Sequence, residues 1–296
     1  MILTALLAVL ISQLSPFLGL IFLIASGGRN IIINFSSRYV FFIFFSSIVI
    51  LTALLGIFPA DVVRYCDVLI GVGVGAFIFL MFMMTTTKYE TSILAFSGFT
   101  IIYAFVRSQV FGNVLLQSYD LFAKMNPALL PFGKNLSSEQ LAMFKYVVKV
   151  GRNMVENYNI AIWTVGMIVA AYVGSVLLTR SRAMVWEHKF LKFPHALVYP
   201  VIVTMIMVII PETKILGFNL MISILPLYLI QGIALIDFFW GVPLAKAPIL
   251  RFLLILVILL NYPILLLLII VGLLDTWFNF RKIEIREEND ENHFVE

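Results

Sequence analysis

The chain has 296 residues, of which 62% are apolar and only 12% carry a charge, about half the charged share of a typical soluble domain. A mean hydropathy of +1.05 leaves too little polar surface to cover the apolar side chains in water, which excludes a soluble globular protein. The net charge of +4 does not indicate nucleic-acid binding, because basic residues in membrane proteins first fix orientation and contact anionic lipids. The composition predicts an integral membrane protein whose main partner is the lipid bilayer.

A helix that rises 1.5 Å per residue needs about 20 apolar residues to cross about 30 Å of hydrocarbon. Eight segments approach this length. The first contains Ser15 and Pro16, and a cleaved signal peptide is its alternative interpretation, although the segment is too long and lacks a basic start. The predicted spans are residues 2–24, 39–58, 68–84, 93–111, 159–178, 190–210, 215–236 and 249–274.

Polar and helix-breaking residues separate these spans. Residues 112–137 include several prolines and glycines, which predicts irregular backbone outside the membrane. Ser137 and Gln140 then match a capping box, and apolar residues recur every three or four positions opposite charged ones. This pattern predicts an interfacial amphipathic helix over 138–156. Residues 281–296 are expected to form a charged, solvated tail.

The distribution of Lys and Arg bears on orientation. With eight spans, 11 of the 20 basic residues lie on the side of the termini, which favours cytoplasmic termini in a bacterial inner membrane. The dense basic loop after the fifth span argues for the opposite orientation.

Small residues in the third span indicate a packing surface. Gly71 and Gly75 are four residues apart and therefore share one helix face, where a neighbouring backbone can approach closely. A ligand site is the alternative, but helix packing is the favoured interpretation.

Polar side chains inside the C-terminal spans are the strongest candidates for a ligand site, because an unsatisfied polar group in hydrocarbon costs a few kcal/mol. Asn219 and Gln231 lie in the seventh span, and Asn261 lies in the eighth. Hydrogen bonds between helices would also explain them, since each contributes roughly 0.6 to 2 kcal/mol in a membrane. Both interpretations remain open at this point.

The segment between these two spans contains Asp237 and Trp240 in an apparent Trp-Gly-x-Pro turn. A polar solute at a cavity mouth and a local ion pair both fit this pattern. Asp275 lies one turn inside the interfacial Trp277, where a paired carboxylate is the plain explanation and ion or proton coupling is the alternative. Arg107 lies near a predicted membrane edge, where snorkelling of its long side chain suffices as an explanation.

Enzymatic and metal-dependent functions have little support in the sequence. The region of Gly133 and Lys134 lacks the upstream glycine and the Ser/Thr of a phosphate-binding loop, so no ATPase motif is present. The single Cys66 and three histidines offer few metal ligands, and we expect no metal and no cofactor. Three acids, Asp67, Asp237 and Asp275, lie in or near spans, but on different segments. We therefore do not expect an enzyme.

Two stretches carry a family resemblance. Leu229 to Ala234, and the end of the eighth span from Gly272 to Lys282, resemble the C-terminal signature of the YybS-like family of bacterial integral membrane proteins. The layout of that family is similar to the substrate-binding components of energy-coupling-factor transporters, which capture small solutes while separate subunits hydrolyse ATP. The resemblance implies solute capture and transporter subunits as partners. Those components commonly have six spans and an Ala-x-x-x-Ala pattern, for which the nearest match here is Ala8 with Ser12.

The sequence thus predicts an all-α polytopic transmembrane bundle of about eight spans with one amphipathic helix. Its hypothetical function is capture of a small-molecule solute for transport, through Asn219, Gln231, Asp237, Trp240 and Asn261, with Asp275 as a candidate for ion or proton coupling. The alternative is a membrane scaffold that holds another membrane protein through the Gly71 and Gly75 face and the amphipathic helix.

Overall fold

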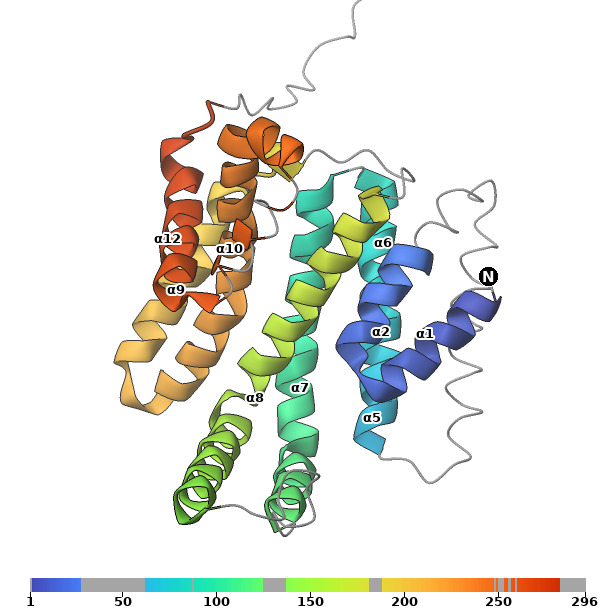
Figure 1. Cartoon of the computed structure of the whole chain (residues 1–296), viewed down its shortest axis with the longest axis vertical. Coiled ribbons are helices and arrows are strands. Elements are labelled where there is room, and N and C mark those ends of the chain that lie inside the picture. Colours follow the sequence, from blue (N-terminus) through green and yellow to red (C-terminus); the bar gives the residue numbers. More distant parts are fainter. Residues whose placement is uncertain are drawn as a thin grey trace, which may run out of the picture. The chain divides into compact units, whose positions relative to one another are not determined.

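The structure is a computed structural model that describes residues 2–27, 62–86, 88–124, 137–180, 188–247, 249, 253–254, 257–258 and 260–282. These residues form helices joined by short turns, with no strand among them, so the predicted all-α fold class is confirmed (Figure 1). The predicted span 39–58 lies outside the described residues.

Among the described residues, four helical segments are long and apolar enough to cross a membrane: Val62–Thr86, Tyr89–Leu121, Ser138–Thr179 and Pro211–Gly241. Three further predicted spans correspond to shorter apolar helices, at Pro16–Ser26, His195–Ile209 and Tyr262–Phe278. Each of these three helices is shorter than the segment predicted as a span, 2–24, 190–210 and 249–274 respectively.

The predicted span 2–24 is a helical hairpin instead of one straight helix. Helix α1 (Ile2–Leu14) ends at Ser15, and α2 (Pro16–Phe22) begins at the next residue and continues into a π-helix, η1 (Leu23–Gly27). Ser15 is extended, with φ −155° and ψ 119°, because a residue before proline avoids the α region. Gly19 has no side chain and therefore lets α2 lie directly against Ser12 of α1 (Figure 1).

The third span is built from three consecutive helical pieces, α5 (Val62–Cys66), the π-helix η2 (Asp67–Val74) and α6 (Gly75–Thr86). Helix α7 (Tyr89–Lys124) packs against α6, and Phe79 meets Tyr89 and Phe96 edge to face with centroid distances of 6.0 and 6.2 Å. Residues 112–124 were predicted to be irregular, but they continue α7. The helix-breaking prolines of that region begin only at Pro127.

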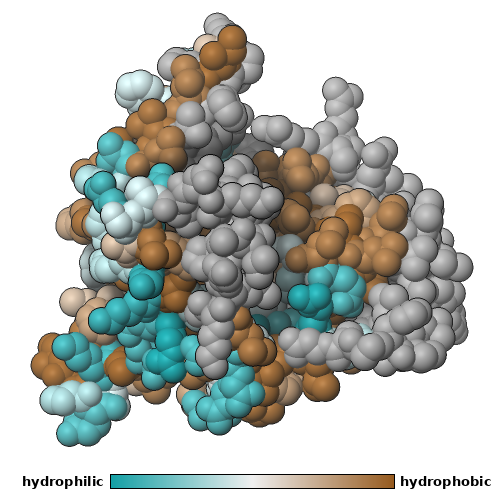
Figure 2. Space-filling view, turned by 60° about the horizontal axis from the view of Figure 1, so that its bottom comes forward, coloured by the Kyte–Doolittle hydropathy of each residue, from teal (hydrophilic) through white to brown (hydrophobic). Residues whose placement is uncertain are grey.

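Helix α8 (Ser138–Arg180) joins the predicted amphipathic helix to the fifth span, with a kink at Tyr158 (φ −125°, ψ 16°). The predicted capping box is present: Ser137 N–H donates to Gln140 Oε1 at 2.9 Å, and Gln140 N–H donates to Ser137 Oγ at 3.2 Å. The first half of α8 packs along the end of α7, where Tyr119 donates to the Val148 carbonyl at 3.0 Å. Hydrophilic and hydrophobic patches adjoin on the molecular surface that Figure 2 shows.

Helix α9 (Val198–Ile209) is shorter than the predicted span 190–210, because residues before it form the 3₁₀ turns η4 (His188–Phe190) and η5 (His195–Leu197). Ile210 is extended before Pro211, which begins the turn η6 (Pro211–Thr213). Helix α10 (Lys214–Lys246) then returns along α9, and Gly217 provides the close approach to Met207 and Val208.

The chain divides into two compact units. The first unit comprises residues 1–186 and 196–227, and the second comprises residues 187–195 and 228–296. Helix α10 contributes its first half to one unit and its second half to the other. The Trp-Gly-x-Pro sequence after Asp237 was predicted to be a turn, but it lies within α10.

In the second unit, α12 (Tyr262–Phe278) begins near the middle of the predicted span 249–274. Asn261 interrupts that span with φ −114° and ψ 97°, and its side chain caps α12 by accepting from Ile264 N–H at 3.3 Å. Gly232 of α10 and Gly272 of α12 lack side chains where the two helix backbones meet.

Candidate functional site

A buried ion pair joins two helices of the first unit. Arg107 of α7 donates from Nε to Oδ1 of Asp67 at 2.7 Å and from Nη2 to Oδ2 at 2.9 Å. The two residues are only 8% and 4% exposed, so the predicted snorkelling of Arg107 is wrong. A bidentate pair of this kind satisfies both charges within an apolar environment.

Three further side chains complete this arrangement, which we call the Asp67 cluster. Tyr103 donates its hydroxyl to Asp67 Oδ1 at 2.8 Å, and Asn159 Oδ1 accepts from Arg107 Nη1 at 2.9 Å. The ring of Trp163 lies 4.3 Å from Arg107 Cζ, a cation–π contact. Every hydrogen-bonding group on Asp67 is therefore engaged.

Helical spacing explains how the sequence assembles the Asp67 cluster. Tyr103 and Arg107 are four residues apart on α7, and Asn159 and Trp163 are four apart on α8, directly after its kink at Tyr158. Asp67 is the first residue of the π-helix η2. Such π-helical segments are rare and occur often at functional sites.

A cavity of about 360 Å³ borders this cluster. Its wall includes the turn of the α1–α2 hairpin, from Gln13 to Phe17, together with side chains of α5, α7 and α8. This volume is within the range of small-molecule sites, roughly 300 to 1,000 Å³. The lining residues are Gln13, Leu14, Pro16, Phe17, Val63, Arg64, Asp67, Arg107, Leu115, Val155, Asn159, Ile162 and Trp163.

Two residues that line the cavity each carry a buried donor without a partner. They are Nε2 of Gln13 and Nε1 of Trp163. Leaving a buried N–H without an acceptor costs about 1–3 kcal/mol, and such groups are uncommon in native proteins. An acceptor supplied from outside the protein would remove this cost.

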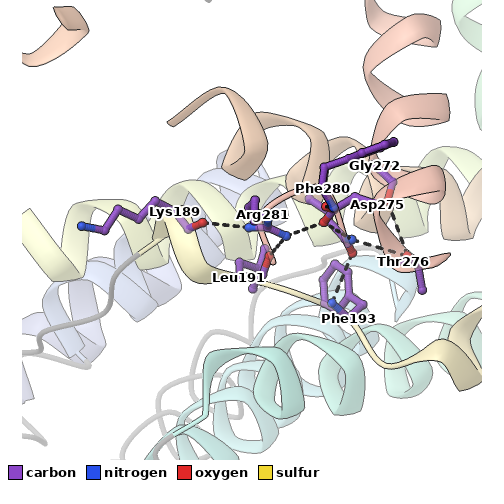
Figure 3. Close-up of polar contacts among 9 residues, drawn as sticks. Lys189, Leu191, Phe193, Gly272, Asp275, Thr276, Phe280 and Arg281 are labelled. Carbon is purple, nitrogen blue, oxygen red and sulfur yellow. Dashed lines mark hydrogen bonds and ion pairs between the residues drawn. The ribbon is translucent and has the colours of Figure 1, made fainter. Parts of the chain in front are cut away.

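A second buried ion pair lies in the second unit, between Arg281 Nη2 and Asp275 Oδ2 at 2.6 Å (Figure 3). Both side chains are fully buried, so residue 281 does not belong to the solvated tail predicted for 281–296. Residues beyond 282 lie outside the described part of the chain.

Backbone groups surround this second pair. The carbonyls of Lys189 and Leu191 accept from Arg281 at 2.8 and 2.7 Å (Figure 3). Asp275 also accepts from Gln231 Nε2 at 3.0 Å and from Phe280 N–H at 3.1 Å. We call Gln231, Asp275, Thr276 and Arg281 the Asp275 cluster.

The end of α12 explains why Arg281 reaches Asp275. Asn279 adopts the left-handed conformation, with φ 45° and ψ 57°, and its N–H donates to the Asp275 carbonyl. Asparagine is one of the few residues that tolerate this conformation after a helix. The chain therefore turns back at Asn279 and places Arg281 beside the carboxylate one turn before the helix end.

The other predicted site residues are distributed over both units. In the first, Asn219 accepts from Ala161 N–H at 3.0 Å and donates to the Asn157 carbonyl at 2.6 Å. In the second, Asp237 lies 2.7 Å from His188 Nδ1, and Trp240 is exposed. The polar side chains of Asn219 and Gln231 thus each form hydrogen bonds to other segments of their own unit.

The two packing glycines face aromatic side chains of the same unit. A Cβ on Gly71 would lie 2.9 Å from Trp163 Cζ2, and one on Gly75 would lie 3.0 Å from Phe96 Cε2. The three acids that an enzyme would need to bring together each contact a different basic side chain: Asp67 contacts Arg107, Asp237 contacts His188, and Asp275 contacts Arg281. The described residues contain no group of three side chains able to hold a metal ion.

The sequence analysis did not single out Gln13, Tyr103, Asn159 or Trp163. One available signal was the presence of opposite charges at the start of one predicted span and within the next, Asp67 before residues 68–84 and Arg107 within 93–111, because such residues usually pair inside a membrane protein. The two unpartnered donors had no sequence signal, since only the hairpin turn brings Gln13 to this cavity. Comparison with protein-family models, with curated proteins and with solved structures finds no match for this chain.

Proposed function

We propose that this protein is a membrane-embedded binding component for a small polar solute, with the cavity beside the Asp67 cluster as the binding site. The observation that carries the proposal is the pair of buried, unpartnered donors on the wall of a cavity of about 360 Å³. Four helices of the described residues are long and apolar enough to cross a membrane, which supports the membrane-embedded part of the proposal. The resemblance to energy-coupling-factor substrate-binding components favours solute capture for separate transporter subunits.

The chemistry of the cavity suits reversible binding better than catalysis. Asp67 is engaged by Arg107 and Tyr103, so its carboxylate is held in place and is not available as a nucleophile or a base. The apolar part of the wall, including Leu115 and Val155, can contact the body of a solute while the polar groups fix its orientation.

Ligand-dependent thermal stabilisation of the purified full-length protein tests this proposal. A panel of vitamins, nucleosides, amino acids, organic acids and sugars should include at least one compound that raises the melting temperature in a saturable way. Val155→Trp, which fills the cavity, should abolish that shift. Leu177→Trp on the exposed face of the same helix is the matched control and should retain it. No shift with any compound would overturn the proposal.

A scaffold is the second candidate function. Its support is a set of apolar side chains on the first half of α8 that remain exposed, including Met143, Tyr146 and Val147. The Gly71 and Gly75 face is already covered by aromatic residues of the same unit, so this role would depend on α8. Co-purification of a stoichiometric protein that is lost on Met143→Glu and Val147→Glu, with solute binding unchanged, would favour it.

A further inference from the structure

The unused hydrogen-bonding groups of the cavity indicate what kind of solute it binds; this inference rests on the proposed function. Of the buried groups without a partner, the two that belong to lining residues are both N–H donors, Gln13 Nε2 and Trp163 Nε1. The indole N–H of Trp163 can only donate, and the residue is 5% exposed. A ligand that satisfies it must therefore present an acceptor.

The side-chain oxygens of Asp67 and Asn159 beside the cavity already accept hydrogen bonds from partners within the protein. Both carboxylate oxygens of Asp67 accept from Arg107, and one also accepts from Tyr103. Asn159 Oδ1 accepts from Arg107 Nη1, which leaves its Nδ2 as another donor near the cavity. A cationic ligand would have to compete with Arg107 for Asp67, whereas an anionic ligand would meet donors that are still free.

The charge of the lining residues points in the same direction. Among the described lining residues, Asp67 is the only acid, and Arg107 neutralises it. Arg64 adds a second cation, and its side chain is exposed and lines the cavity. The described lining residues therefore carry a net positive charge, which attracts an anion.

We propose that this cavity binds a small organic anion through a carboxylate or phosphate group, with Arg64 as the ion-pair partner and Gln13 and Trp163 as hydrogen-bond donors. The apolar lining residues Leu115 and Val155 contact the organic part of the ligand. Two sources can supply this chemistry, a free solute anion or the headgroup of an anionic lipid.

Matched probes separate these possibilities. Benzoate and benzamide have nearly the same shape but differ in charge, and glycerol 3-phosphate and choline add a phosphate and a cation. Short-chain phosphatidylglycerol and phosphatidylcholine represent the lipid source. We expect benzoate or glycerol 3-phosphate to raise the melting temperature of the full-length protein in uncharged detergent, whereas benzamide, choline and phosphatidylcholine leave it unchanged. A shift with phosphatidylglycerol alone identifies the lipid source.

Substitutions test the roles of the donors. Trp163→Phe keeps an aromatic ring but removes the N–H, and Arg64→Gln removes an exposed charge without disturbing the core. Each should weaken anion binding by about tenfold, since a hydrogen bond to a charged group contributes enough for that change. Arg64→Lys should restore part of the affinity.

Gln13→Leu provides a readout that a merely structural glutamine would not give. It removes an unpartnered donor, so the ligand-free protein should melt at a higher temperature while anion affinity falls. Thr100→Val is the matched control, because the Thr100 hydroxyl is also buried without a partner but does not line the cavity. It should not reduce anion affinity.

The outcomes distinguish this inference from the proposed function. Stabilisation by benzamide or choline but not by any anion would overturn the anion inference and leave solute binding intact. Anion binding that is unchanged in Trp163→Phe and Arg64→Gln would also overturn it. Stabilisation by no compound at all, in this set or in the wider panel, would overturn both.

Discussion

The Asp67 cluster and the Asp275 cluster contain the same chemical pair, an aspartate and an arginine buried between helices, but they differ in what surrounds it. Arg281 donates to Asp275 and to two backbone carbonyls, and Asp275 accepts from two further groups. One donor of this cluster, Arg281 Nε, has no partner. Arg107 and Asp67 instead line a cavity, and two other residues that line it, Gln13 and Trp163, each carry a buried donor without a partner.

This difference shows how one ion pair can serve two purposes. The Asp275 cluster ties the end of α12 to the segment of residues 189–193 and to α10, which is a structural role. The Asp67 cluster fixes the position of Arg107 and Trp163, while donors on two residues that line the cavity have no acceptor. Unsatisfied polar groups destabilise a protein, so their retention beside a cavity favours a binding role.

Removal of the arginine from the Asp275 cluster should have the largest effect on stability. Arg281→Met leaves the fully buried Asp275 without its cation and leaves the Lys189 and Leu191 carbonyls without their donor. We expect a loss of about 3–5 kcal/mol in the free energy of unfolding. Denaturant unfolding in detergent measures it, and the double variant with Asp275→Leu should recover much of the loss.

Substitution of the arginine in the Asp67 cluster should reduce stability less. Arg107→Met leaves Asp67 without its cation, but water in the adjoining cavity can hydrate the carboxylate. We expect a loss of about 2–3 kcal/mol by the same unfolding measurement. A loss greater than that of Arg281→Met would show that the two clusters do not differ in the way described.

A packing glycine of the first unit, Gly217, provides a smaller, independent test. A Cβ on Gly217 would lie 2.8 Å from the Val208 amide nitrogen, so Gly217→Ala should destabilise the α9–α10 hairpin by about 1–3 kcal/mol. Gly98→Ala is the control, since a Cβ there meets nothing within 4 Å and alanine favours the helix. Equal melting temperatures for the two variants would contradict the close helix contact.

The smallest expected effect concerns Lys192, which lies outside the helices of the second unit. Burial, the largest cause, lowers the pKa of Lys192 below its ordinary value of 10.5; Asp275 partly opposes this change and Arg281 adds to it. The folded protein therefore holds fewer protons than the unfolded chain between the lowered pKa and 10.5, and stability rises with pH through that window.

Lys192→Met should remove that rise and change stability at neutral pH by no more than about 0.5 kcal/mol. Melting temperatures of the wild type and the variant, measured from neutral to alkaline pH, provide the comparison. A rise of the same size in both proteins would assign it to other groups.

Composition and apolar run length were sufficient to predict the helical class, the membrane-capable helices and the capping box at Ser137. They could not predict the break within residues 2–24, because Pro16 fits within an apolar run and acts through the conformation of Ser15. Sequence analysis also missed the extension of α7 past residue 111, because the composition of residues 112–137 was interpreted as a loop.

The candidate site was harder to predict for a different reason. Sequence analysis directed attention to polar residues in the C-terminal half, and the structure gives Asn219 and Gln231 partners within their own units. Neither spacing nor composition indicates which polar groups lack a partner, because that depends on contacts between residues as distant in sequence as Gln13 and Trp163.

Thiol accessibility at the two clusters tests most directly whether one is open and the other closed. In a Cys66→Ser background, Gln13→Cys places a thiol on the cavity wall, and Thr276→Cys places one of similar size to threonine in the Asp275 cluster. We expect a small hydrophilic thiol reagent to modify position 13 rapidly and position 276 only after unfolding. Equal rates at the two positions in the folded protein would contradict the account.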